Sequence, residues 1–282
     1  MPGLLAFHAH PDDEVTSTGG TLARYAAAGE QVVVVTATDG AEGEVHNYDN
    51  PDEVKARLAD VRAEEIADAL RILGVRHHEW LGYRDSGMMG EPSNDHPECF
   101  WQADFNEATA RLIRYIRMYQ PEVMTIYDPF GGYGHPDHIN VHRVGLAAHH
   151  HALDFARFPL EDDEEPWQPR KLYWSVWPRS RVRAMAELRF DSGLIDESQR
   201  KRMQEGGHPD EDVSAWISVE QHYGVKEQAW RAHRSQIPED WFFFQVPPEQ
   251  RPKVFGAEAF LRVDSRGLVC HDPEDDLFAG LR

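Results

Sequence analysis

The hydrophobic positions in the first two thirds of the chain follow two alternating patterns. Five short apolar runs predict β-strands, at residues 4–9, 31–40, 76–82, 122–129 and 170–178. Between them, apolar residues at helical spacing predict α-helices, at residues 19–30, 51–75, 104–123 and 135–155. Strands that alternate with helices of this length build βαβ units. The pattern therefore predicts an α/β fold with a mainly parallel sheet and helices on both faces.

Beyond about residue 180 the alternation becomes weaker. The segments that still stand out predict a solvated loop, a helix and two strands, at residues 201–212, 218–237, 241–247 and 258–263 respectively. We expect residues 1–160 to form the core and residues 161–282 to form a smaller C-terminal α+β portion. That portion completes the fold and the substrate pocket, either as a separate unit or within one single domain.

Three polar stretches follow predicted strands at the point where each strand ends. They are "HPDDE" at 10–14, "TDGAEGE" at 38–44 and "YDPFGGYGHPDH" at 127–138. In open parallel sheets, ligands bind outside the carboxyl ends of the strands. We therefore expect these three stretches to converge in space and to form one site.

Composition and charge narrow the classes of partner. No apolar run is long enough to span a bilayer and the first residues lack the features of a signal peptide, so we expect a cytoplasmic protein. The formal net charge of -20 opposes binding to nucleic acid or to an anionic membrane. Two cysteines cannot build a disulfide framework. A small-molecule partner is expected, and assembly into a homo-oligomer stays open.

The residue types at two of the strand ends suggest a metal site. His10 and Asp13 are three positions apart at a strand-to-helix turn, and His138 opens the helix that follows the fourth strand. Two imidazoles and one carboxylate leave a coordination position of Zn²⁺ open to water or substrate. The same set also suits Fe²⁺, so one divalent metal is predicted, with Zn²⁺ as the first choice.

The neighbouring side chains can then handle protons and charge. Asp12 is a spare carboxylate and is a candidate general base for water, whose pKa falls towards about 7 on such a metal. His135 is placed to stabilise an oxyanion or to protonate a leaving amine, and Tyr133 can donate a hydrogen bond to the same oxyanion. Either motif alone is also explained by helix capping, whereas both together are much harder to explain in this way.

The motifs as a set resemble the LmbE-like family of metal-dependent N-deacetylases. The resemblance lies in "HAHPDDE", "TDGAEGE", "YRDSG" and "GGYGHPDH", and it extends over most of the chain except about 180–220. The family includes N-acetylglucosaminyl-phosphatidylinositol deacetylases and the deacetylases and amidases of mycothiol metabolism. The resemblance implies a Rossmann-like fold and the hydrolysis of an N-acyl amide on a glucosamine.

Residue by residue, the resemblance implies the same roles for the metal and catalytic candidates as the chemistry above. It adds Arg62 and Asp85 as side chains that hold sugar or inositol hydroxyls, and Ser17 in the turn after the first motif. The mycothiol-conjugate amidases tend to carry a lysine at the position of Ser17. However, "ECF", "FARFP" and "AHRSQI" resemble that amidase branch. The sequence therefore leaves both a GlcNAc-inositol deacetylase and a mycothiol S-conjugate amidase open.

Two alternatives belong to other classes of protein. A sugar- or nucleotide-binding module without catalysis is one, although neither glycine-rich stretch has the spacing of a phosphate-binding loop. A metal that only joins the two strand ends is the other, although structural zinc sites usually have four protein ligands. The hydrolase is the interpretation that assigns roles to the histidines and aspartates of both motifs together.

Overall fold

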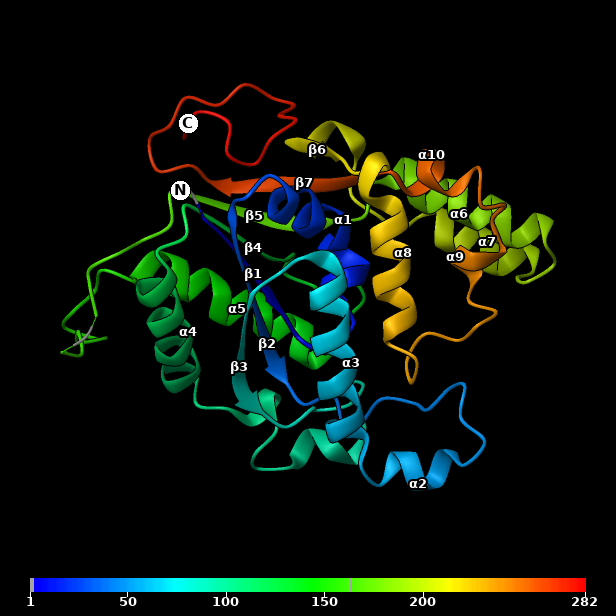
Figure 1. Cartoon of the computed structure of the whole chain (residues 1–282), viewed down its shortest axis with the longest axis horizontal. Helices are drawn as coiled ribbons and strands as arrows, with labels where there is room; N and C mark the ends of the chain where they lie inside the picture. Colours follow the sequence, from blue (N-terminus) through cyan, green and yellow to red (C-terminus); the bar gives the residue numbers. More distant parts are fainter. Residues whose placement is uncertain (1–2, 163) are drawn as a thin grey trace.

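A single mixed sheet forms the centre of the molecule (Figure 1). The computed structural model describes residues 3–162 and 164–282, and in this part of the chain the sheet has seven strands in the order β3-β2-β1-β4-β5-β7-β6. Neighbouring strands from β3 to β5 are parallel, whereas β7 is antiparallel to both β5 and β6. The strands are β1 Gly3–His8, β2 Gln31–Thr38, β3 His77–Tyr83, β4 Val123–Tyr127, β5 Lys171–Val176, β6 Ala215–Ser218 and β7 Ala257–Asp264.

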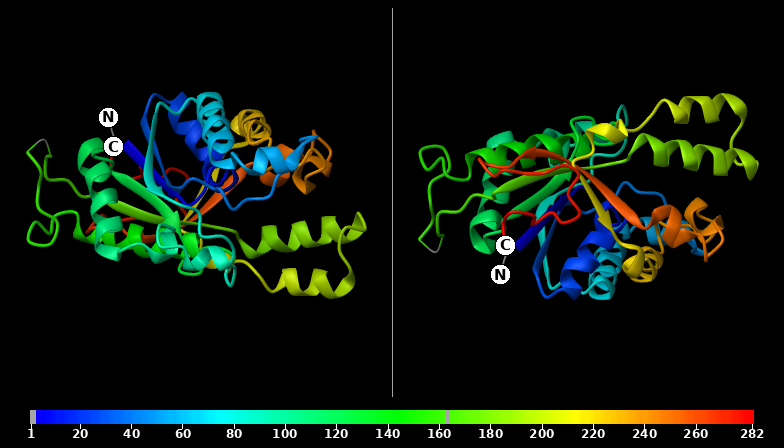
Figure 2. Two further views of the ribbon diagram at one scale, coloured as in Figure 1. Left: turned by 90° about the horizontal axis from the view of Figure 1, so that it is seen from below. Right: turned by 90° about the horizontal axis from the view of Figure 1, so that it is seen from above.

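Helices cover the sheet on both sides, as the sequence predicts (Figure 2). One hydrophobic core lies under α1 (Asp13–Ala27), α3 (Leu58–Leu73) and α8 (Tyr223–Ala232). A second core lies on the opposite face, under α4 (Phe105–Tyr119) and α5 (Pro136–His151). The α/β fold class is confirmed, with a Rossmann-like order of the parallel strands.

Local sequence explains where several of these elements begin and end. The valine run of β2 is buried throughout, as expected for a parallel strand that is covered on both faces. Helix α3 ends at Gly74, whose φ of 78° is left-handed. Helix α4 begins after Asp104, whose side chain accepts a hydrogen bond from the amide of Glu107. Helix α1 begins at Asp13, earlier than predicted, so the acidic motif forms its first turn.

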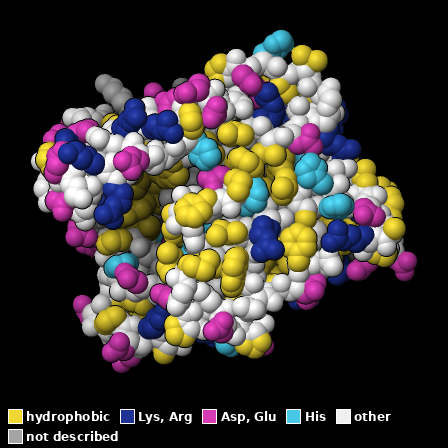
Figure 3. All heavy atoms as spheres, turned by 180° about the vertical axis from the view of Figure 1, so that it is seen from behind, with side chains coloured by type: hydrophobic (Ala, Val, Ile, Leu, Met, Phe, Trp, Pro, Cys, Tyr) yellow, Lys and Arg dark blue, Asp and Glu magenta, His cyan; other side chains and the backbone are white. Residues whose placement is uncertain are grey.

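The remaining helices are shorter or lie away from the sheet. They are α2 Pro51–Lys55, α6 Arg179–Asp191, α7 Glu197–Gln204, α9 Phe242–Gln245, α10 Arg251–Phe255 and the 3-10 turns Pro92–Asp95, Phe100–Gln102, Asp210–Asp212 and Glu220–His222. Helices α6 and α7 project from the body as a two-helix arm (Figure 2). Seen from behind, charged side chains are dense on the surface of this arm (Figure 3).

Most differences from the sequence predictions fall in the second half. The predicted strand at 241–247 is wrong, because this segment contains helix α9. A short apolar run does not distinguish a buried strand from a buried helix, and here Trp241 and Phe243 pack their rings against Trp230. The predicted loop at 201–212 begins inside α7. Helix α6 was not predicted, because among its residues only Ala186 is buried and the helix has no apolar stripe.

The sheet extends across the predicted boundary at residue 160. Strands β1 to β4 come from the first portion, and β5, β6 and β7 continue the same sheet from the second. The predicted single helix at 51–75 is two helices, α2 and α3, with a break between Lys55 and Leu58. The division into two units stays a prediction.

The chain reverses its direction across the sheet between β1 and β4. From β1 it continues to β2 and β3 on one side, and β4 and β5 lie on the other side. A crevice forms at such a switch point, outside the carboxyl ends of the two strands. The first and third polar stretches follow these two strands.

Candidate metal centre and active-site cleft

A cleft of about 490 Å³ opens at the carboxyl end of the sheet. Of the side chains predicted for the site, it is lined by His10, Asp12, Asp13, Arg62, Asp85, Tyr133 and His135. His138 lies directly behind, with its Nε2 atom 3.2 Å from Asp13. The expected convergence of the three polar stretches is therefore observed, and the second stretch contributes Glu42 and its neighbours to the wall.

The three predicted metal ligands meet at one carboxylate oxygen. Asp13 Oδ2 lies 3.3 Å from His10 Nδ1 and 3.2 Å from His138 Nε2. The second nitrogen of each imidazole contacts an acceptor, since His10 Nε2 lies 3.1 Å from Asp137 Oδ2 and His138 Nδ1 lies 3.1 Å from the carbonyl of Gly131. With protons on those nitrogens, the atoms that face Asp13 keep their lone pairs, as metal-binding histidines require.

The charges around this cluster also favour a cation. Burial lowers the pKa of His10, but the nearby charge of Asp85 and hydrogen bonds with Asp13 and Asp137 hold it well above its ordinary value. Burial raises the pKa of Asp13, but His138 and His10 hold it well below its ordinary value. The carboxylate of Asp13 therefore stays ionised and favours positive charge beside it. These residues fit a divalent metal.

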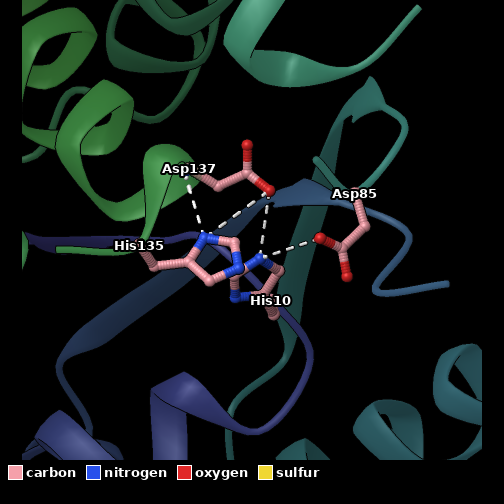
Figure 4. Close-up of side chains that lie close together, drawn as sticks. All are labelled: His10, Asp85, His135 and Asp137. Carbon is pink, nitrogen blue, oxygen red and sulfur yellow. Dashed lines mark hydrogen bonds and ion pairs between the residues drawn. The ribbon is translucent and has the colours of Figure 1, made fainter. Parts of the chain in front are cut away.

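Asp137 contacts His10 from behind the cluster, and the sequence assigned no role to it (Figure 4). Its side chain is fully buried and accepts hydrogen bonds from the amide and the hydroxyl of Ser86, in addition to its contact with His10. A carboxylate behind a ligating histidine fixes the tautomer and the orientation of the ring. The motif "GHPDH" contains Asp137, but its partners Ser86 and His10 lie 51 and 127 positions away in the sequence. The motif alone therefore does not indicate this role.

Gly131 allows His138 to approach the loop before α5. Its φ is 65°, and a Cβ atom at this position would lie 2.4 Å from Cβ of His138. We expect Gly131→Ala to displace His138 and to weaken metal affinity about 10- to 100-fold, measured by zinc titration. Gly132→Ala is the matched control, because Gly132 also has a positive φ of 76° but nothing within 4 Å of its Cβ position. Equal effects of the two variants would contradict this role.

Asp12 lies beside the cluster with its own partners. Its carboxylate is 3.3 Å from the guanidinium of Arg62. Burial raises the pKa of Asp12 to about 6, in spite of the opposing charge of Arg62. A carboxylate with such a pKa can accept a proton near neutral pH. Arg62 is itself buried and donates hydrogen bonds to the carbonyls of Gly40 and Pro11, so its predicted contact with substrate stays a prediction.

His135 and Tyr133 occupy the other wall of the cleft. Burial, together with the charges of His10 and His138, lowers the pKa of His135 to about 3, so the imidazole is neutral at pH 7. Its Nδ1 atom accepts a hydrogen bond from the amide of Asp137 and caps helix α5, which leaves the proton on Nε2. Tyr133 is half exposed, and its hydroxyl lies 3.4 Å from His138 Nε2. Both side chains can donate a hydrogen bond.

The predicted substrate-binding residues differ in their positions. Asp85 lines the cleft and accepts hydrogen bonds from the amides of Gly87 and Glu42. Ser17 is not among the residues that line it: this side chain faces a neighbouring cavity of about 20 Å³, whereas Thr16 lines both. The role of Ser17 stays a prediction.

The C-terminal portion supplies wall residues that the sequence did not identify. They are Gln236, Ile237 and Trp241, which follow helix α8. In the sequence, the segment "AHRSQI" only resembles one branch of the family, and no spacing links it to the first motif. Its approach to the cleft depends on the packing of α8 against α1 and α3.

Comparisons with known proteins place the chain in a family. The profile of the family described as PIG-L, GlcNAc-PI de-N-acetylase, matches residues 5–149. A protein of Thermomonospora curvata, named 1D-myo-inositol 2-acetamido-2-deoxy-alpha-D-glucopyranoside deacetylase, is 41% identical, and the match covers 99% of this chain and 96% of that protein. The chain belongs to this family. A protein of the same name from Salinispora arenicola is 40% identical, over 99% of this chain and 91% of its own.

Solved structures share the fold of this PIG-L family member. N,N'-diacetylchitobiose deacetylase from Pyrococcus horikoshii has a TM-score of 0.62 at 22% identity, over 93% of this chain and 84% of its own. A conserved protein from Thermus thermophilus has a TM-score of 0.59 at 24% identity, over 98% of this chain and all of its own. At these identities the likeness concerns the fold alone. Among the described residues, no helix combines the length and the apolar composition that a membrane span requires.

Proposed function

We propose that this protein is a metal-dependent hydrolase that removes the acetyl group from the glucosamine nitrogen of GlcNAc-inositol. The observation that carries the proposal is a cleft in which Asp12 lies beside the cluster of His10, Asp13 and His138. Relatives that match over nearly the full length carry the name of this deacetylase, which supports the choice of substrate.

His10, Asp13 and His138 are the residues that we propose to hold the metal. Zn²⁺ is the first choice, and Fe²⁺ suits the same two imidazoles and one carboxylate. A metal bound there would act as a Lewis acid towards the amide carbonyl and lower the pKa of water. Asp137 and the carbonyl of Gly131 keep the two imidazoles in the tautomers that this requires.

The side chains of the cleft supply the proton transfers. Asp12 accepts a proton from the attacking water as its oxygen bonds to the amide carbon. Tyr133 and the neutral His135 donate hydrogen bonds to the negative charge that develops on the carbonyl oxygen. Asp12 then returns the proton to the nitrogen as the C–N bond breaks. The products are acetate and the free amine.

The cleft also suits a sugar conjugate of two rings. Its volume lies within the usual range for small-molecule sites. Asp85 faces it as a buried carboxylate, and we propose that it accepts hydrogen bonds from sugar or inositol hydroxyls. Arg62 lies at the same wall and, with Ser17 nearby, belongs to the proposed substrate-binding set.

A panel of substrates tests this function. Metal-loaded protein is assayed for amine release with GlcNAc-inositol, a mycothiol S-conjugate, GlcNAc-malate and free GlcNAc oligomers. We expect the highest kcat/KM for GlcNAc-inositol and loss of all activity with a chelator. Faster turnover of the S-conjugate would assign the protein to the amidase branch, and ligand binding that survives chelation without any turnover would assign it to the binding modules.

A further inference from the structure

The backbone at Asp12 has a conformation that an aspartate rarely adopts. Its φ is 124° and its ψ is -26°, between the end of β1 and the start of α1. Non-glycine residues persist in such conformations only where the surrounding groups enforce them. The proposed general base therefore depends on the contacts that hold this turn.

One of these contacts comes from a side chain in the same motif. The amide of Asp12 donates a hydrogen bond of 2.9 Å to Glu14 Oε2. The carbonyl of Asp12 accepts hydrogen bonds from the amides of Val15 and Thr16, which begin helix α1. The helix therefore holds the carbonyl of Asp12, and Glu14 holds its amide.

Glu14 is fixed in turn by a residue of the C-terminal portion. Its Oε1 atom lies 2.6 Å from Nε2 of His233, and both side chains are fully buried. His233 follows the last turn of α8, and its amide donates to the carbonyl of Trp230. Since α8 packs against α1 and α3, the position of this imidazole is set by the hydrophobic core.

We propose that His233 is a positioning residue for the general base. It orients Glu14, and Glu14 holds the amide of Asp12 so that the carboxylate is directed into the cleft. The proposal rests on the proposed function, because that function makes Asp12 the base.

The metal ligands are held by other groups. The carboxylate of Asp13 accepts a hydrogen bond of 2.8 Å from the amide of His10, and the two imidazoles contact Asp137 and Gly131. Loss of the His233 contact should therefore change catalysis more than metal binding. A displacement of about 1 Å in a reacting group can cost about 100-fold in rate.

Two variants that replace His233 by an amide side chain distinguish a positioning role from a general contribution to stability. The side chain of His233→Gln is long enough to donate to Glu14, whereas that of His233→Asn is too short. We expect His233→Asn to lower kcat by about 10- to 100-fold. KM and zinc affinity should stay within about threefold of the wild type, since neither the cleft wall nor the metal ligands lose a partner. His233→Gln should recover most of kcat.

His149 provides the matched control. It is another fully buried histidine, and its Nε2 atom lies 3.1 Å from Asp264 Oδ2, far along α5 from the cleft. His149→Asn should lower thermal stability without a change in kcat. If His233→Asn behaves in the same way, or loses its metal, or is not rescued by His233→Gln, the positioning role is wrong.

Crystal structures of the variants test the positioning role independently of the proposed function. An absence of turnover by the wild type would refute the deacetylase but not the positioning role. In that case the backbone at Asp12 is the readout: it should leave its positive φ in His233→Asn and keep it in His233→Gln. An unchanged Asp12 in both variants would refute the positioning role. If His233→Asn does not fold, His233→Met can be compared with His233→Gln instead, because the methionine side chain is closer in volume to histidine and cannot donate to Glu14.

Discussion

Replacement of Asp12 by alanine is expected to lower kcat by about 10²- to 10⁴-fold while one metal ion stays bound. Asp12 contacts Arg62, and the cluster of His10, Asp13 and His138 does not include it. The variant therefore removes the proton acceptor without removing a ligand. Acetate release and metal content, measured on the same preparation, check both parts of the prediction.

Asp12→Ala leaves the buried charge of Arg62 without its carboxylate partner, so a second variant is needed. Arg62 is buried, and an unpaired buried guanidinium lowers stability. Asp12→Asn keeps the size of the side chain and an oxygen that can face Arg62, and it should be as inactive as Asp12→Ala. Near-full activity of either folded, metal-loaded variant would exclude Asp12 as the base.

Loss of the metal is expected to have the largest effect. A chelator should abolish activity, and Zn²⁺ or Fe²⁺ should restore it in the wild type. His138→Ala should bind metal too weakly for reactivation, because its Nε2 atom is one of three ligand atoms that lie within 4.8 Å of one another. Metal content by mass spectrometry and activity after metal addition are the measurements.

Helix α5 offers a control for this variant. His142 lies one turn after His138 and is also buried, but its Nδ1 atom contacts the carbonyl of Tyr127 and the residue is not part of the cluster. His142→Ala should keep its metal and be reactivated like the wild type. A metal-free His138→Ala with full activity would show that the reaction needs no metal at this site.

The sequence was sufficient for most of the first half of the fold. Apolar runs and helical spacing are local properties, and they predicted all five parallel strands. In the second half, the same criteria assigned a strand to the aromatic segment of α9 and missed α6. The two errors have different causes: α9 is a short apolar run that could equally be a buried strand, whereas α6 lacks the regular apolar stripe of a helix that packs on the sheet.

The sequence by itself also indicated that the residues of the two His-Asp motifs lie close together. His10, Asp12 and Asp13 are nearly contiguous, and His138 follows a strand that neighbours β1. Their types and their positions at strand ends were enough to place them together. Only the tertiary structure decided the polar contacts that support these residues. They are the contacts of Asp137 with His10, of Arg62 with Asp12 and of His233 with Glu14.

The physical reason is the difference between local and long-range information. A hydrophobic pattern or a motif is encoded by neighbouring residues, whereas a hydrogen bond between residues 219 positions apart depends on how whole helices pack. The same packing decided that Thr16 rather than Ser17 lines the cleft, since adjacent residues of a helix face different directions. The sequence thus determined the chemical groups of the site, and the tertiary structure determined what orients them.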